Sequence, residues 1–384
     1  MKIIIAPDSF KGSMTAQQIS ETLTMGMKSV FPEADYIQIP VADGGEGTVK
    51  TLVNITGGKI IPAKVSGPMG RSVDAYYGIL GDQQTAVIEM AVASGITMVK
   101  KEERNPLYTT TYGTGELIRH ALDQGIRKMM IGLGGSGTND GGTGMAQALG
   151  IQFFDKKDQL IQDKMNGYLM GQVQRINMSS LHPKIKGCEV MVACDVDNLF
   201  SGPNGAARIY APQKGADPEV VRILDDHLNR LAFIIKRDLG ISINQLAGAG
   251  AAGGLGGGLV AFLNAKLQRG IEIILKHINF ENTIRDADLI ITGEGKIDET
   301  TLRGKTPLGI ARMASRCNIP VIAIAGEVAL TSDQIYNEGV DLLLSITNGP
   351  ISETSAMAHA PELVRRCGER VARLIKMGQR LKKQ

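Results

Sequence analysis

The sequence has little net charge and few cysteines and histidines, and these shortages exclude several classes of protein. The formal net charge is +3, too small to indicate a nucleic-acid partner. The four cysteines, Cys188, Cys194, Cys317 and Cys367, form no CxxC pair, and the five histidines form no HExxH pattern. We therefore expect neither disulfides nor structural zinc, and we predict buried, reduced thiols in a cytoplasmic protein.

Long hydrophobic runs are also missing. The N-terminal run "KIIIAPDSF" is interrupted by Pro7 and Asp8, so it is too short for the core of a signal peptide. Residues 239–265 carry no charge, but their segment "LAGAGAAGGLGGGL" is half glycine and offers a bilayer little apolar surface. We expect no membrane span, and we interpret the basic run "RRCGERVARLIKMGQRLKK" as a solvated last helix rather than a membrane-surface helix.

What the sequence does have is α/β patterning at both ends of the chain. Thr15 and Gln18 form a capping box after an apolar strand, and an amphipathic helical pattern follows. Strands are predicted at residues 3–6, up to Val41, and in "DLIITGEG", "PVIAIAGE" and "DLLLSITN". These five strands predict one doubly wound parallel sheet with helices on its faces.

The middle of the chain follows a different pattern. The segment "GKIIPAKVSGPMGRSVDAYYGILGDQQTAVIEMA" alternates apolar and polar residues between turn signals, as antiparallel strands do. A chain of 384 residues predicts about two domains. We therefore expect a discontinuous sheet domain, residues 1–66 and 286–384, an inserted mixed α/β domain, residues 67–285, and a ligand in the cleft between them.

Candidate site residues follow the predicted strands, because ligands of an open parallel sheet bind beyond the carboxyl ends of its strands. Carboxylates, hydroxyls, lysines and glycine backbones suit phosphate and a hard divalent cation. The candidates are Asp8, Ser9, Lys11, Asp43, Glu46, Glu294 and Asp298 in the first domain, and Ser136, Thr138, Asn139, Asp140, Asp195 and Asp197 in the second.

The segment "GLGGSGTNDGGTGMAQALG" at residues 132–150 predicts a phosphate-binding loop, since glycine lets an anion approach backbone N–H groups. The alternative is that the glycines serve close packing and tight turns. For the second glycine-rich run, "AGAGAAGGLGGG", the sequence supports packing and phosphate contact equally. Both runs match GxGxxG, which leaves dinucleotide binding as an alternative. The sequence "GKT" at residues 304–306 is not a Walker A loop, because its first glycine would fall at Glu299, but Lys305 can still neutralise phosphate.

Together, the segments "APDSFKGSMTA", "ADGGEGT", "GGSGTNDGG", "ACDVDN", "APQKGA", "GAGAAGG" and "ITGEGKID" resemble the bacterial glycerate kinase family, which includes enzymes of glyoxylate and glucarate utilisation. The resemblance covers nearly the whole chain. It implies a flavodoxin-like sheet domain and ATP- and Mg²⁺-dependent phosphorylation of D-glycerate, usually at the 2-hydroxyl. The oligomeric state stays open.

Phosphoryl transfer assigns roles to the candidates. We expect Gly134, Gly135, Ser136, Thr138, Asn139 and Lys305 to hold ATP, and Asp195 and Asp298 to be the metal ligand and the general base, in either order. Lys11 is the first choice for binding the carboxylate of glycerate, with Arg71, Arg208 and Lys214 as alternatives. Asp8, Ser9, Asp43 and Glu294 are expected to line the substrate site. Three other functions remain open: a glycerate 3-kinase, an NAD(P)-dependent oxidoreductase of a small hydroxy acid, and a non-catalytic sensor.

Overall fold

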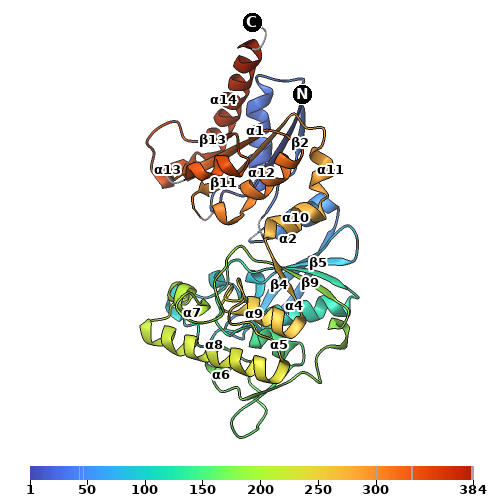
Figure 1. Ribbon diagram of the computed structural model, residues 1–384, viewed down its shortest axis with the longest axis vertical. Coiled ribbons are helices and arrows are strands. Elements are labelled where there is room, and N and C mark those ends of the chain that lie inside the picture. The colour runs from blue at the N-terminus through green and yellow to red at the C-terminus, as the bar shows by residue number, and fades with distance from the viewer. Residues whose placement is uncertain (43, 46, 300, 330–331, 382–384) are drawn as a thin grey trace. The chain divides into compact units, whose positions relative to one another are not determined.

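The computed structural model describes residues 1–42, 44–45, 47–299, 301–329 and 332–381 (Figure 1). The chain folds into two compact units. Unit 1 consists of residues 1–43 and 271–384, and unit 2 of residues 44–270. Unit 2 is therefore one continuous insertion in unit 1.

Unit 1 contains a five-stranded parallel sheet in the order β13-β12-β11-β1-β2. Its strands are β1 (Lys2–Pro7), β2 (Asp35–Gln38), β11 (Leu289–Ile297), β12 (Val321–Val328) and β13 (Leu342–Ser345). Numbered along the chain this is the order 2-1-3-4-5 of flavodoxin-like sheets, so the predicted fold class is confirmed.

Helices cover both faces of this sheet. Alternate residues of β1, such as Ile3 and Ile5 against Ile4 and Ala6, belong to two separate cores, one on each face. One core packs against α1 (Ala16–Lys28) and α14 (Ala360–Leu381), and the other against α10 (Gly270–His277), α11 (Phe280–Ile284) and α12 (Thr306–Arg316). The capping box of Thr15 and Gln18 is present at the start of α1.

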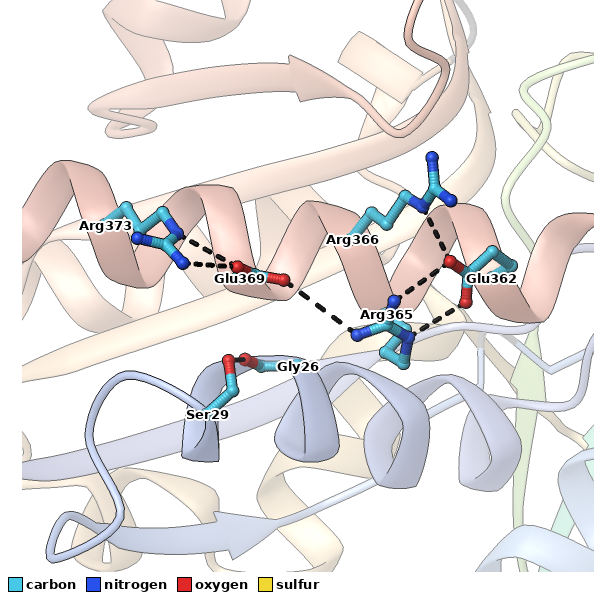
Figure 2. A network of polar contacts seen from close by, with 7 residues as sticks. All are labelled: Gly26, Ser29, Glu362, Arg365, Arg366, Glu369 and Arg373. Atoms are coloured by element: carbon cyan, nitrogen blue, oxygen red, sulfur yellow. Dashed lines mark hydrogen bonds and ion pairs between the residues drawn. The ribbon is translucent and has the colours of Figure 1, made fainter.

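The basic C-terminal segment forms α14, which packs along α1. Leu363, Val364 and Val371 are buried on one side. Arg365, Arg366 and Arg373 pair with Glu362 and Glu369 on another side of the helix (Figure 2). The two helices approach so closely that a Cβ on Gly26 would lie 2.0 Å from the carbonyl oxygen of Arg365.

Unit 2 is built on a mixed six-stranded sheet in the order β10-β9-β6-β5-β4-β3. The predicted antiparallel strands are present as β3 (Lys59–Ser66), β4 (Ser72–Ile79) and β5 (Thr85–Glu89). The parallel part continues with β6 (Lys128–Gly132), β9 (Glu189–Ala193) and β10 (Lys266–Gln268), and β7 (Gln152–Phe154) pairs with β8 (Arg175–Asn177). Its helices are α2 (Thr48–Thr56), α3 (Ala91–Ser94), α4 (Tyr112–Asp123), α5 (Thr143–Ala148), α6 (Gly167–Met170), α7 (Ala206–Tyr210), α8 (Pro218–Leu239) and α9 (Leu255–Leu263).

The division of the chain lies elsewhere than the expected boundaries, 66/67 and 285/286. Helix α2 packs against β3, β4 and β5, so residues 44–66 belong with the mixed sheet. Ile271, Leu275 and Phe280 are buried in the same core as α12, so residues 271–285 belong with the parallel sheet. Local sequence does not specify these tertiary contacts, and the boundaries move accordingly.

The four cysteines are free thiols, as expected, but only Cys367 is fully buried. Cys188, Cys194 and Cys317 are half-buried, so the prediction of buried thiols is wrong for these three. Among the described helices, none has both the length and the apolar character needed to cross a membrane.

Candidate functional site

In unit 1, five of the predicted site residues line one cavity of about 700 Å³. They are Asp8, Ser9, Lys11, Glu294 and Lys305. Asp8 to Lys11 follow β1, Glu294 lies near the carboxyl end of β11, and Lys305 directly precedes α12. The structure therefore brings these five residues together at the carboxyl edge of the parallel sheet, where β1 and β11 are neighbours.

Hydrogen bonds hold two of the carboxylates that line this cavity, those of Asp8 and Glu294, in place. Asp8 is only 6 % exposed, and its Oδ2 accepts a hydrogen bond from Thr306 Oγ1 at 2.9 Å. Glu294 is 9 % exposed; its Oε1 accepts from Thr301 Oγ1, and its Oε2 lies 3.8 Å from Lys305 Nζ. Both carboxylates are thus fixed by residues at the start of α12 or just before it, which couples this helix to the edge of the sheet.

Asp298, the other described candidate of unit 1, is not among the residues that line this cavity. Asp298 is half-buried directly after β11, in a turn where Thr301 N donates to its carbonyl oxygen at 3.0 Å. Asp43 and Glu46 lie outside the described residues.

In unit 2, the predicted phosphate loop joins β6 to α5, but it is longer and more buried than a simple strand-to-helix turn. Gly134 and Gly135 are exposed, whereas Ser136, Thr138 and Asn139 are buried. Only the Gly134–Gly135 part of the predicted loop therefore offers its backbone to a ligand from solvent.

The two glycine-rich segments pack against each other. Gly141 N donates to the carbonyl oxygen of Gly253 at 3.0 Å, and a Cβ on Gly253 would lie 2.0 Å from the carbonyl oxygen of Thr138. Any side chain at residue 253 would separate the two backbones. This contact supports the close-packing interpretation of the second run.

A buried lysine lies beneath the loop. Lys214 is 3 % exposed, and its Nζ donates to Ser136 Oγ and to the carbonyl oxygen of Thr138, both at 2.7 Å. Burial lowers the pKa of Lys214 to about 7, while the nearby carboxylate of Asp140 acts in the opposite direction. Lys214 therefore supports the loop from inside and does not offer its ammonium group to solvent.

Asp140 is completely buried beside this lysine. Burial raises the pKa of Asp140, and this is opposed by hydrogen bonds from the backbone and hydroxyl of Thr111 and the backbones of Gly142 and Gly144. These bonds fix the path of the chain into α5. Asp140 is thus a structural anchor of the loop.

Two side chains in the loop are buried without partners among the described residues. They are Thr138, through Oγ1, and Asn139, through both Oδ1 and Nδ2. A buried polar group without a partner costs about 1–3 kcal/mol. These atoms mark the loop as a place where a water molecule or a ligand group would be stabilising.

The other unit 2 candidates are two aspartates and two arginines. Asp195 follows β9, and its Oδ1 accepts from Gly270 N at 3.0 Å; Asp197 lies two residues further on. Arg208 pairs with Asp225 at 3.1 Å, and Arg71 is highly exposed, 3.8 Å from Glu103. Asp195 therefore belongs to a different unit from Asp298, its expected partner.

Neither GxGxxG match has the structural context of a dinucleotide site, in which a strand leads directly through the glycines into a helix. After Gly132, α5 begins only at Thr143. The second match, at residues 248–253, opens α9 but follows no strand. The fold thus gives the oxidoreductase interpretation no support.

Comparison with known proteins assigns the family. The model of the glycerate kinase family matches residues 3–376. The chain belongs to the glycerate kinase family. It is 48 % identical over 377 residues to a glycerate kinase of Bacillus subtilis (strain 168), covering 98 % of each chain. It is 43 % identical over 380 residues to a glycerate 2-kinase of Escherichia coli (strain K12), covering 99 % of each.

A solved structure from Salmonella typhimurium LT2, assigned as glycerate kinase 2, has the same fold. The TM-score is 0.88 at 45 % identity, and the match covers 99 % of each chain. The resemblance read from the sequence motifs is therefore confirmed for this member of the glycerate kinase family.

Most of the residues that line the unit 1 cavity were not predicted from the sequence. They include Ser345 at the end of β13, Ile346 and Thr347 directly after it, and Met357 of α13 (Glu353–Ala358). A signal was present, because "SITNGP", at the end of the fifth predicted strand, contains polar and turn residues, as do the segments that were singled out.

Proposed function

We propose that this protein is a glycerate kinase that transfers the γ-phosphoryl group of ATP to D-glycerate, at the 2-hydroxyl. The observation that carries the proposal is the match along almost the entire chain to proteins named glycerate kinase, one of them a glycerate 2-kinase. The cavity at the sheet edge supports it, because it combines carboxylates and lysines as phosphoryl transfer requires.

Positioning two anions for reaction requires groups that neutralise their charge. We assign Lys305 and the exposed backbone of Gly134 and Gly135 to the phosphates of ATP. Ser136, Thr138 and Asn139 are assigned to the same phosphate loop, where their buried positions give them a supporting role. Lys11 is assigned to the carboxylate of glycerate, because it lines the cavity, whereas Lys214 is buried in unit 2 and Arg208 is not a cavity-lining residue.

Asp8, Ser9 and Glu294 are assigned to the wall of the substrate site, together with Asp43, and Arg71 remains an alternative partner for the carboxylate of glycerate. Asp298 and Asp195 are assigned to the metal and to the attacking hydroxyl, in either order. A carboxylate that accepts the proton of a hydroxyl contributes about 10²–10⁴-fold to the rate.

The residues fit magnesium that enters with the nucleotide. No group of three or more metal-binding side chains lies together in the described part of the chain. Mg²⁺ in kinases is usually held by one or two carboxylates and by the phosphates of the substrate, so such a group is not needed. When bound, the ion would neutralise charge on the transferred phosphate.

Steady-state kinetics of ADP formation with D-glycerate and ATP test these assignments. We expect Asp298→Asn and Asp195→Asn each to lower kcat by about 10²-fold or more. The matched controls are Asp35→Asn in unit 1 and Asp226→Asn in unit 2, both exposed positions that should leave kcat unchanged. Wild-type turnover in either test variant removes that aspartate from the assignment, and the absence of glycerate-dependent ADP formation in the unmodified protein refutes the proposed function.

A further inference from the structure

Three asparagines of the chain, Asn166, Asn204 and Asn348, are each followed directly by glycine. The side-chain amide of an asparagine is open to attack by the backbone nitrogen of the next residue, which leads to deamidation. Glycine favours this attack because it has no side chain and few conformational restrictions. Whether a pair reacts therefore depends on how firmly the structure holds the asparagine side chain and the glycine N–H.

The structure holds the pair at residues 166–167 firmly. Asn166 is the N-cap residue of α6, and its Oδ1 accepts hydrogen bonds from Tyr168 N at 3.1 Å and from Leu169 N at 2.9 Å. Gly167 is buried, and a Cβ on it would lie 2.5 Å from the carbonyl oxygen of Pro106. Attack on the amide of Asn166 would therefore break the helix cap and displace a packed backbone.

The pair at residues 204–205 is held through its backbone. Gly205 N donates to the carbonyl oxygen of Gly202 at 2.8 Å, and the carbonyl oxygen of Asn204 accepts from Leu199 N at 3.2 Å. Gly205 is buried and is also the N-cap residue of α7. The nitrogen that would attack is thus already engaged in a hydrogen bond.

The pair at residues 348–349 lies in the exposed segment after β13. The chain is fixed up to Thr347, whose backbone N donates to Ser345 Oγ at 3.2 Å. Both Asn348 and Gly349 are exposed, and no group in the described part of the chain is hydrogen-bonded to the Asn348 side chain or to the Gly349 N–H. A Cβ on Gly349 would have open space. Nothing in the described structure therefore opposes approach of the Gly349 nitrogen to the Asn348 amide.

We propose that Asn348 is the site at which this protein deamidates spontaneously. The backbone nitrogen of Gly349 attacks the side-chain carbonyl carbon of Asn348 and forms a carbon–nitrogen bond. The side-chain nitrogen leaves as ammonia and carries away, through water, the proton of the Gly349 N–H. Water then opens the five-membered succinimide ring, at one carbonyl to give aspartate and at the other to give isoaspartate.

This modification changes the wall of the unit 1 cavity. Gly349 and Pro350 line the cavity, together with the carboxylates of Glu327 and Glu353. Either product adds a negative charge next to Gly349, and isoaspartate also lengthens the backbone there by one carbon. Because like charges repel, we expect the modified cavity to bind anions less tightly. This consequence rests on the proposed function, under which one such anion is glycerate.

Peptide mapping by mass spectrometry, after incubation of the full-length protein at alkaline pH, tests the proposal. We expect Asn348 to deamidate about tenfold or more faster than Asn166 and Asn204, because those two pairs must first break hydrogen bonds. Equal rates at the three asparagines, or faster conversion at Asn166 or Asn204, would overturn the proposal.

The variant Gly349→Ala tests the identity of the attacking group. Its methyl group fits into open space but hinders the adjacent nitrogen, so we expect conversion of Asn348 to slow by about tenfold. An unchanged rate would show that the Gly349 nitrogen is not the attacking group and would overturn the proposal.

Kinetics before and after the same incubation test the consequence for binding. We expect kcat/KM for D-glycerate to fall about two- to fivefold in the unmodified sequence, with a smaller loss at high salt, while Gly349→Ala keeps its own starting value. An equal loss in both proteins would contradict a role for residue 348. The peptide map does not depend on turnover, so conversion at Asn348 in a protein that never phosphorylates glycerate would refute the proposed function and leave the deamidation site standing.

Discussion

The buried lysine of unit 2 makes a quantitative prediction about stability. In the unfolded chain Lys214 has a pKa of 10.5, and burial lowers it to about 7 in the folded protein. Between these two values the unfolded chain binds a proton that the folded protein does not bind. The free energy of unfolding therefore rises with pH across this window, by about 1.4 kcal/mol per pH unit at most.

Replacing Lys214 by methionine removes this dependence and keeps a side chain of similar length. The variant loses the hydrogen bonds to Ser136 Oγ and Thr138 O at every pH, so their loss shifts the whole stability curve without changing its slope. Relative to the unmodified protein, we expect the variant to lose about 2–3 kcal/mol of stability as the pH rises from 6 to 9.

Urea denaturation between pH 6 and pH 9 measures this difference. The matched control is Lys376→Met, since Lys376 is an exposed lysine of α14, and its curve should run parallel to that of the unmodified protein. Parallel curves for Lys214→Met and the unmodified protein would refute the argument, because Lys214 would then titrate alike in the folded and unfolded states.

Three further predictions concern packing, the loop anchor and the substrate. Gly26→Ala should lower the free energy of unfolding by about 1–3 kcal/mol, because it forces α1 away from the carbonyl of Arg365. The control Gly378→Ala, where a Cβ has open space, should not lower it. Equal thermal midpoints for the two variants would contradict the close contact. Asp140→Asn should cost about 1.5–3 kcal/mol in urea denaturation, because the amide presents a donor to backbone N–H groups; unchanged stability would contradict the anchoring role. Lys11→Met should raise the KM for glycerate about tenfold or more and leave the KM for ATP near its original value; the opposite pattern would move Lys11 to the nucleotide.

The sheet of unit 1 could be predicted from the sequence because its signals are local. Four of the five strands contain short apolar runs, and the capping box of Thr15 and Gln18 lies within four consecutive residues. The antiparallel strands of unit 2 could also be predicted, since the alternation of apolar and polar residues along β3 and β4 indicates a sheet with one solvated face.

The unit boundaries and the surroundings of the glycine-rich loop could not be predicted in the same way. The pairing of Lys214 with Ser136 joins residues 78 positions apart, and no local pattern reports it. No local pattern reports the contact between Gly253 and Thr138 either. This contact explains why residue 253 is glycine by close packing rather than by ligand binding. Candidate residues of unit 1 were found because the carboxyl ends of parallel strands meet at one edge of the sheet.

Phosphorus NMR of the purified protein with D-glycerate, ATP and magnesium tests the central claim most directly. The account predicts a new phosphomonoester signal split by one carbon-bound proton, as expected for a phosphate on the 2-hydroxyl, with ATP converted to ADP. Splitting by two protons would place the phosphate on the 3-hydroxyl, and intact ATP with no new signal would contradict the assignment of this protein as a glycerate kinase.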